Sequence, residues 1–407
     1  MRPDAGWEKV TIPDYRGPAG EAGKWKGYYQ TQFATPAIPE HKRLIIWFQS
    51  VDYIARVYVN GNFVGSHEGF FASFSFDITS YVEPVGEKNE LTVEVWNDIP
   101  VLGVGDYLDG DKIYGATGPG WDDPDTGWHH CPAGAGITGR VTLEVRPVVY
   151  VEDIVVFPDI DRGAAQVRVG VMNYTDNVLT DYFLEFSLLP RNFTGDPLAE
   201  YRSEVKYIGA GKNEYRYVIP LEGFRLWSPE EPWLYGAVAS LRGETGVSRK
   251  TETVGIKKFV SDGQSIPKGK FYLNNSPVVL RGANEMGHLQ QCVMKKDFGQ
   301  LRDDILIAKM CHMNYYRVTQ RPVQREIYDY FDMLGMMHQC DLPLFSFLRR
   351  PQFAEAVKQC IEMEHLIRSH VSSAIVTFIN ESMSIRKNDD PDSPGSRRSV
   401  TKGHRHL

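Results

Sequence analysis

The chain has 407 residues, of which 42% are hydrophobic and 24% are charged, and its formal net charge is -7. At roughly 100 to 200 residues per domain, this length predicts two to four domains, and the globular composition excludes a chain that is disordered throughout. The modest negative charge provides no broad attraction to nucleic acid or to anionic lipid, so we expect neither as a partner.

The five cysteines are widely spaced and form no C-x-x-C pair, which predicts neither a structural zinc site nor a disulfide framework. The first thirty residues contain no apolar signal-peptide core, and no later stretch reaches the roughly 18 apolar residues of a membrane span. We therefore expect a cytoplasmic protein with no membrane attachment. Since no phosphate-binding glycine motif precedes a predicted helix, we expect no nucleotide and no other cofactor.

From Trp25 to Val145, short runs of β-branched and aromatic residues alternate with turn residues, which predicts β structure. Asn60-Gly61 predicts a tight hairpin turn, because this pair readily adopts positive φ angles. Together with alternating strands such as Leu91–Trp96, these features predict a jelly-roll β-sandwich for residues 1–147. A long loop from Gly103 to Gly139 holds clustered aromatic residues, for which we favour local packing over a metal or sugar site: Trp121, Trp128, His129, His130 and Cys131.

A second β region is predicted for residues 148–260, with short strands such as AQVRVGVMN, YRYVIPL and AVASLRG separated by turn signals. Its length of about 110 residues is typical of an immunoglobulin-like sandwich. No Cys-Trp-Cys framework is present, so an antibody-type domain is not implied.

After Gly269 the hydrophobic period changes, and helices alternate with strands. Apolar strands are predicted at Val278–Leu280, in NYYRVT, at Met336–Gln339 and at Ile375–Ile379. Three helices are predicted. The first starts at about Asp297 and carries Leu301, Ile305 and Ala308, the second has Ile327, Phe331 and Leu334 on one face and stops at Gly335, and the third starts at Phe353. This alternation predicts a parallel sheet covered by helices, and residues 261–407 as the N-terminal half of a (β/α)8 barrel.

Polar residues follow each predicted strand of this barrel, where the chemistry of such barrels is found. They are Arg281, Asn284 and Glu285 after the first strand, Arg317 after the second, Asp341 after the third, and Asn380 and Glu381 after the fourth. Two carboxylates at this edge could act as acid and base, as cleavage of a glycosidic bond requires.

Motifs along nearly the whole chain carry a resemblance to a known family. Val57-Tyr58-Val59-Asn60-Gly61, Trp227-Ser228-Pro229-Glu230, Arg281-Gly282-Ala283-Asn284 and the segment IVTFINES occur in the order found in glycoside hydrolase family 2. The chain therefore resembles the β-galactosidases, β-glucuronidases and β-mannosidases of that family. Two segments depart from the family pattern: Gln320-Arg321 stands where a His-Tyr pair is common, and Glu285-Met286-Gly287-His288 where His-Glu is usual.

The resemblance implies a retaining exo-β-glycosidase that acts on carbohydrate. It assigns Glu381 as the general acid/base and Asn380 as a hydrogen-bond partner of the sugar hydroxyl next to the reacting carbon. Arg281, Asn284, Glu285, Arg317 and Asp341 would bind substrate or support the site. From the residues alone, Arg317 could equally be a structural charge partner of Asp341, and Glu285 an ordinary rim residue.

From Gly269 to Leu407 there are roughly 140 residues, whereas a complete barrel takes about 250. In the family the nucleophilic Glu lies on a later strand than the acid/base, so we expect no nucleophile in this chain. Three hypotheses follow: an incomplete glycosidase, one half of a two-chain enzyme, or a non-catalytic carbohydrate-binding or scaffold protein. An uncovered half-barrel also predicts self-association, or docking of the missing C-terminal half.

Overall fold

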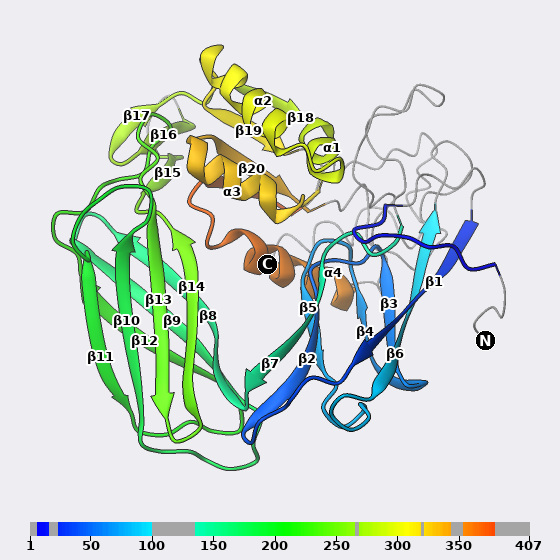
Figure 1. The fold of residues 1–407 in the computed structure, drawn as a ribbon. Helices are drawn as coiled ribbons and strands as arrows, with labels where there is room; N and C mark the ends of the chain where they lie inside the picture. Colours follow the sequence, from blue (N-terminus) through cyan, green and yellow to red (C-terminus); the bar gives the residue numbers. More distant parts are fainter. Residues whose placement is uncertain are drawn as a thin grey trace, which may run out of the picture.

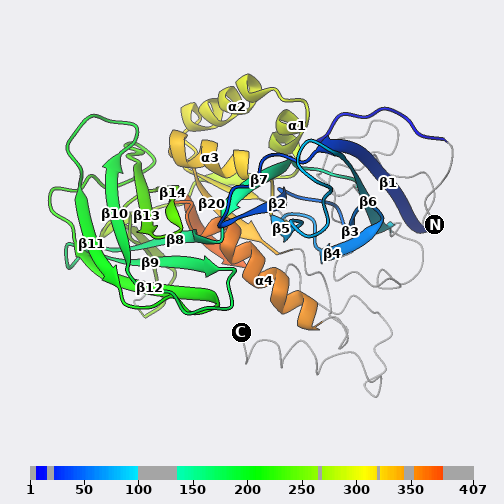
Figure 2. The ribbon, with the colours of Figure 1, turned by 60° about the horizontal axis from the view of Figure 1, so that its bottom comes forward.

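The computed structural model describes residues 6–15, 23–99, 135–264, 268–318, 321–342 and 353–378. They form two β-sandwiches and a third part in which helices cover a parallel sheet (Figure 1). Helix α4 (Phe353–Ile367) lies between the two sandwiches in both views (Figures 1 and 2). The order of the three parts confirms the predicted fold class. Among the residues described, no helix is both long enough and apolar enough to cross a membrane.

The first sandwich stacks a sheet of order β1-β6-β3-β4 on a sheet of order β5-β2-β7, with antiparallel pairing. Its strands are β1 (Gly23–Ala34), β2 (Lys42–Phe48), β3 (Ile54–Val59), β4 (Asn62–Glu68), β5 (Phe74–Asp77), β6 (Lys88–Ile99) and β7 (Val141–Pro147). Alternate residues of each strand face the core, as Val57 and Val59 of β3 do where they pack with Val93 of β6.

The hairpin between β3 and β4 turns at Asn60-Gly61, whose φ angles are 51° and 80°. The side-chain amide of Asn60 also donates to Asn89 Oδ1 at 2.8 Å and to the carbonyl of Tyr81 at 3.0 Å. The pair therefore supplies both the backbone geometry of the turn and a hydrogen-bonded anchor to the neighbouring loop. The hairpin predicted from the sequence is confirmed.

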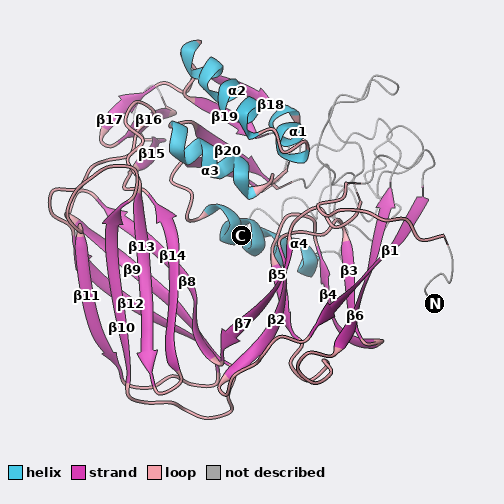
Figure 3. Ribbon diagram, in the orientation of Figure 1, coloured by secondary structure: helices cyan, strands magenta, loops and turns pink. Residues whose placement is uncertain are grey.

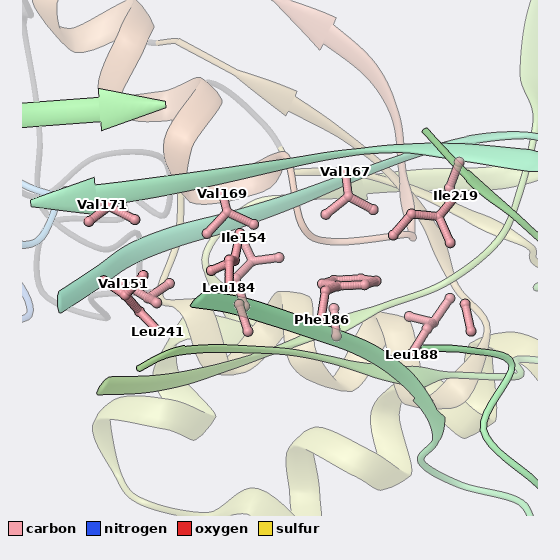
Figure 4. Close-up of a cluster of buried hydrophobic side chains, with 14 of the residues drawn as sticks. Val151, Ile154, Val167, Val169, Val171, Leu184, Phe186, Leu188, Ile219 and Leu241 are labelled. Carbon is pink, nitrogen blue, oxygen red and sulfur yellow. The ribbon is translucent and has the colours of Figure 1, made fainter. Parts of the chain in front are cut away.

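The second sandwich pairs a sheet of order β11-β10-β13-β14 with one of order β12-β9-β8. Its strands are β8 (Val149–Asp159), β9 (Ala164–Asn173), β10 (Tyr182–Pro190), β11 (Ala199–Val205), β12 (Gly211–Pro220), β13 (Tyr235–Gly243) and β14 (Gly246–Val254). Figure 4 shows how Val167, Val169 and Val171 of β9 face Leu184 and Phe186 of β10 across the core. The period-2 alternation of AQVRVGVMN is thus the inward face of a sandwich strand, as predicted.

A small antiparallel sheet of β15 (Phe259–Asp262), β16 (Lys270–Leu273) and β17 (Ser276–Val278) precedes the parallel sheet. The prediction of Val278–Leu280 as the first barrel strand is wrong. Asn274 and Asn275 form a turn with φ angles of 52° and 67°, so that Val278 pairs back with Phe271, and Val279 is 68% exposed. A short apolar run cannot by itself distinguish a hairpin strand from a barrel strand.

The parallel sheet has the order β18 (Gly282–Glu285), β19 (Tyr315–Val318), β20 (Met337–Asp341) and β21 (Ser373–Thr377). Helices α1 (His288–Met294), α2 (Phe298–Met310), α3 (Arg325–Leu334) and α4 alternate with these strands (Figure 3). Asp297 caps α2 by accepting from the backbone N–H of Gln300 at 3.0 Å, and Gly335, at a φ of 72°, ends α3. The predicted start near Asp297 and the predicted stop at Gly335 are confirmed, whereas the short helix α1 gave no periodicity from which to predict it.

Two residues tie the second sandwich to the barrel part: Trp227, between β12 and β13, and Lys257, just after β14. The indole of the fully buried Trp227 donates to the backbone carbonyl of Asp332 at 2.9 Å. The ammonium group of Lys257 donates to the carbonyl of Ser373 at 2.5 Å and lies 5.4 Å from the centre of the Trp227 ring. A positive charge is therefore held in a largely apolar junction between the parts.

This junction predicts a pH dependence of stability. Burial lowers the pKa of Lys257 to about 7, although the carboxylate of Asp332 opposes the shift. The unfolded chain keeps a lysine pKa of about 10.4, so between about pH 7 and pH 10 the unfolded state binds more protons and the free energy of unfolding rises with pH. Lys257→Met should remove this contribution, which is at most about 1.4 kcal/mol per pH unit.

The measurement is the denaturant midpoint of the parallel-sheet part at several pH values in this window. The exposed Lys270→Met is the matched control and should keep the parent slope. If Lys257→Met and the parent chain gain stability equally as the pH rises, the charge of Lys257 does not titrate as described.

Candidate active site

Polar side chains of three neighbouring strands share one face of the parallel sheet. Asn284 of β18 is in register with Arg317 of β19, which is in register with Gln339 of β20. Residues in register point to the same face, and the next position along each strand points to the other. On that other face Val318 and Cys340 pack into the helix-covered core. The polar row therefore lies on the face that the helices do not cover, which is the inner face of a barrel.

Arg317 and Asp341 form a charge-assisted pair at the carboxyl end of this row. Nε and Nη2 of Arg317 donate to Oδ2 of Asp341 at 2.9 and 2.6 Å. The side chain of Asp341 is fully buried, whereas that of Arg317 is 28% exposed. Arg317 therefore provides the cation next to the buried Asp341 carboxylate at the edge of the sheet.

Three further side chains complete a hydrogen-bonded group, which we call the Arg317–Asp341 network. The amide of Gln339 donates to Asp341 Oδ1 at 2.7 Å and to Thr377 Oγ1 at 2.8 Å, and its oxygen accepts from the Tyr315 hydroxyl at 2.7 Å. Burial raises the pKa of Tyr315 to about 12, and the charge of Asp341 adds to the shift, so the phenol stays protonated and donates. The network fixes the orientation of the Asp341 carboxylate across three strands.

The structure places the other predicted site residues at different positions. Asn284 is exposed beside Arg317, at the same edge. Arg281 precedes β18 at the opposite, amino end of the strand, where its Nε donates to the carbonyl of His312 at 2.9 Å. Arg281 and the Arg317–Asp341 network thus lie at opposite ends of the sheet.

Glu285 lies on the helix-covered face and is 4% exposed. One carboxylate oxygen accepts from the backbone N–H groups of Gly287 and Leu289, both at 2.9 Å, at the start of α1. Burial raises the pKa of Glu285, while these hydrogen bonds and the charge of Arg321 oppose the shift. These contacts give Glu285 a structural role as the acceptor for the first turn of α1.

Asn380 and Glu381 lie outside the described residues, as do Gln320, the aromatic and His-His-Cys residues predicted in the loop from Gly103, and the tail from Arg386. In the sequence, Asn380 and Glu381 follow Thr377 by only a few positions. Thr377 ends β21 and belongs to the Arg317–Asp341 network. The described part of β21 therefore leads toward the edge where the network lies.

Tyr315, Gln339 and Thr377 were not predicted as site residues. A signal for them was present, because Tyr315 stands two positions before Arg317, and Gln339 two before Asp341, on strands with a period of two. The predicted site included only residues at or after the end of each strand, and Tyr315 and Gln339 lie within their strands. Applying the strand alternation from Arg317 and Asp341 backward would have identified both.

A second polar cluster lies near α3, where ligand atoms of Asp329, Asp332 and His370 lie within 4.8 Å of one another. The carboxylate of Asp332 accepts from the backbone N–H and hydroxyl of Ser372 at 2.8 and 2.5 Å, and pairs with His370 Nδ1 at 2.7 Å. These bonds fasten α3 to the segment before β21. We therefore interpret the cluster as a structural link between a helix and a strand.

Three family models match the chain in the order of its three parts. They are described as the glycosyl hydrolase 2 galactose-binding domain-like model, at residues 20–101, the glycosyl hydrolases family 2 model, at 149–257, and the glycosyl hydrolases family 2 TIM barrel domain, at 265–389. The last match contains the whole Arg317–Asp341 network together with Asn380 and Glu381.

Curated proteins and solved structures agree with these matches. A β-galactosidase of Thermoanaerobacter pseudethanolicus is 24% identical in an alignment that covers 88% of this chain and 45% of the relative. A β-galactosidase of Priestia megaterium is 27% identical in an alignment that covers 76% of this chain and 28% of the relative. A β-glucuronidase structure from Parabacteroides merdae has a TM-score of 0.75 at 17% identity, and covers 99% of this chain and 50% of that one. The structure of a β-glucuronidase from Bacteroides uniformis has a TM-score of 0.71 at 20% identity, and the match covers 92% of this chain and 43% of that one.

Two sandwiches followed by parallel strands that carry a polar row on their inner face define a multidomain protein with part of a (β/α)8 barrel. The three family matches identify it further: the chain belongs to glycoside hydrolase family 2. It spans about half or less of the length of the relatives named above.

Proposed function

We propose that this chain contributes the first half of the active site of a retaining exo-β-glycosidase. Glu381 acts as the general acid/base, and Asn380 hydrogen-bonds the sugar hydroxyl next to the reacting carbon. The Arg317–Asp341 network and Asn284 line the site beside them. The proposal is carried by one observation: the hydrogen-bonded Asp341 carboxylate lies at the carboxyl edge of a sheet whose last strand precedes Glu381 in the sequence by a few residues.

The reaction runs in two steps. In the first, a nucleophilic carboxylate attacks the anomeric carbon, and Glu381 gives its proton to the leaving oxygen as the glycosidic bond breaks. In the second, the Glu381 carboxylate takes a proton from water, which attacks the same carbon and releases the nucleophile.

The second carboxylate, the nucleophile, must stand about 5 Å from the acid/base in a retaining enzyme. We propose that it is supplied by a barrel segment outside the 407 residues, either in the same polypeptide or in a separate one. The inner face of the parallel sheet and its outermost described strands, β18 and β21, would then receive that segment. Self-association of the chain through this surface is the competing expectation.

A non-catalytic carbohydrate-binding or scaffold protein is the alternative function. It would use the same polar row, because Arg317, Asn284 and Asp341 can contact sugar hydroxyls without a nucleophile. We further propose a reducing, cytoplasmic location, supported by the free thiols of Cys292, Cys311, Cys340 and Cys360.

Turnover of a panel of aryl β-glycosides distinguishes these functions. Galactosides, glucuronides and mannosides would be tested with the 407-residue chain alone, with the chain mixed with a separately produced second half of the barrel, and with the two joined in one polypeptide. We expect no turnover by the chain alone and turnover in at least one of the completed forms.

Each other outcome has a definite meaning. Turnover on mixing supports a two-chain enzyme, and turnover only in the joined form supports a single polypeptide. Turnover by the chain alone would contradict the external nucleophile. Sugar binding without turnover in all three forms would favour the non-catalytic alternative.

A further inference from the structure

The segment that ends the second sandwich belongs to its core and also contacts the barrel part. Val254, the last residue of β14, and Ile256 are buried in the core of the second sandwich. Alternate side chains of an extended segment point to opposite sides, and the intervening residues Gly255 and Lys257 contact the barrel part. The second sandwich therefore presents these two residues on a segment that its own core holds in place.

Gly255 packs directly against Val371, two residues before β21. A Cβ atom at position 255 would lie 2.6 Å from Val371 Cγ2 and 2.7 Å from Val371 Cβ, which is closer than carbon atoms approach each other. The φ angle of Gly255 is not positive, so the close contact and not the backbone conformation requires a glycine. Val371 is 8% exposed and β-branched, so its side chain has little freedom to move away.

Hydrogen bonds hold the two residues that follow Val371. The backbone N–H and the hydroxyl of Ser372 donate to Asp332 Oδ1 at 2.8 and 2.5 Å. The carbonyl of Ser373, the first residue of β21, accepts from the ammonium group of Lys257 at 2.5 Å. Three consecutive residues are thus fixed where β21 begins, two of them by contacts from the second sandwich.

A bulge follows immediately in β21. Ser373 pairs with His338 of β20 and Ile375 pairs with Gln339, so that Ala374 is an extra residue in the pairing. If Ala374 were drawn into the ladder, every later side chain of β21 would turn to the other face of the sheet, because side chains alternate along a strand. The contacts at the start of β21 therefore lie directly before the point that sets its register.

The register of β21 decides whether Thr377 belongs to the Arg317–Asp341 network. Thr377 is opposite Asp341 and accepts from Gln339 at 2.8 Å. A shift of one residue would place Val376 opposite Asp341 and turn Thr377 toward the helices. Among the described strands β21 pairs only with β20, so its pairing constrains the register from one side.

We propose that the second sandwich sets the register of β21, with Gly255 and Lys257 as positioning residues that fix where the strand begins. Thr377 then faces the Arg317–Asp341 network, and Glu381, a few positions later in the sequence, is directed toward the same site. The statement about Glu381 rests on the proposed function, whereas the register of Thr377 does not. The sandwich would in this way influence the reaction without contacting the substrate.

The test compares phenyl and dinitrophenyl β-glycosides as substrates of the joined polypeptide that contains the whole barrel. Because the dinitrophenyl group leaves without a proton, the ratio of kcat/KM for the phenyl substrate to that for the dinitrophenyl substrate reports the placement of the acid. Gly255→Ala adds a methyl group against Val371, and Lys257→Met removes the hydrogen bond to Ser373. We expect each variant to lower the ratio by about tenfold or more. A protein that is only less stable loses both activities equally and keeps the ratio.

Gly263→Ala and Lys270→Met are the matched controls. A Cβ atom at position 263 would meet nothing within 4 Å, and Lys270 is exposed, so both variants should keep the parent ratio. A crystal structure of the 407-residue Gly255→Ala chain gives a second measurement, in which Thr377 should no longer lie opposite Asp341. If Gly255→Ala does not fold, Lys257→Met decides alone, since it adds no bulk to the junction.

A lower ratio in both variants and in neither control supports the proposal. An unchanged ratio in both variants, together with a lower ratio in Glu381→Gln, overturns it and leaves the proposed function standing. An unchanged ratio in Glu381→Gln as well would contradict the proposed function, and the crystal structure then decides about the register. Thr377 still opposite Asp341 in that structure would overturn the role of the second sandwich.

Discussion

Replacing Glu381 by glutamine should lower the turnover of aryl β-glycosides by about 10²- to 10⁴-fold in a form of the protein completed with its second catalytic carboxylate. The amide cannot give a proton to the leaving oxygen, and it cannot take one from water. The loss should therefore be largest for substrates with poor leaving groups and much smaller for dinitrophenyl glycosides, whose leaving oxygen needs no proton. Steady-state rates across a series of leaving groups measure this dependence.

Rescue by azide is a second test of the Glu381→Gln variant. As a nucleophile that needs no general base, azide should restore the second step in Glu381→Gln and yield a β-glycosyl azide. The exposed Glu222→Gln is the control and should behave like the parent protein. Equal losses for all leaving groups, with no rescue by azide, would assign Glu381 a role other than acid/base.

Replacing Arg317 by methionine should destabilise the parallel sheet by about 3 kcal/mol, because it leaves the fully buried carboxylate of Asp341 without its cation. Gln339 would still donate to Asp341, but one neutral hydrogen bond does not replace two charge-assisted ones. Hydrogen exchange of the amides in β19 and β20 measures the effect where it arises, since unfolding of a multidomain chain need not be two-state.

A double variant tests the cause. Adding Asp341→Asn to Arg317→Met removes the carboxylate charge and should recover at least half of the lost stability. Arg302→Met, which removes an exposed arginine of α2, should change little. A loss below about 1 kcal/mol for Arg317→Met would show that water or another group solvates Asp341, and that the pair does not hold the carboxylate in place.

Local backbone chemistry explains why much of the fold could be predicted. Asn60-Gly61 and Gly335 adopt positive φ angles, and Asp297 caps a helix through its own side chain. Each of these effects involves only residues close together in the sequence, so the sequence alone is enough to predict it. Val278 failed as a prediction because its strand pairing depends on which neighbour it meets, β16 or β19, and an apolar run is compatible with both.

The positions of the candidate site residues could be predicted in part for a similar reason. Arg317 and Asp341 could be predicted because a residue at a strand end reaches the edge of the sheet. Glu285 also stands at a strand end, but one residue out of phase, so its side chain turns to the helices and caps α1. Which face of the sheet Glu285 points to depends on where β18 begins, because side chains alternate along a strand. The first strand was predicted at Val278–Leu280 and not at Gly282–Glu285, so the face of Glu285 could not be predicted.

We propose one account of the barrel part: its inner face contributes half of a retaining site, in which Glu381, a few positions after Thr377 in the sequence, is the acid/base. The most direct test is a crystal structure of the completed protein with a bound glycoside, in which the separation of the two catalytic carboxyl groups is measured. We predict about 5 Å between Glu381 and the second carboxylate, with Glu381 on the same face as Asp341. A separation of about 6.5 Å or more, or a Glu381 side chain turned toward the helices, would contradict the account.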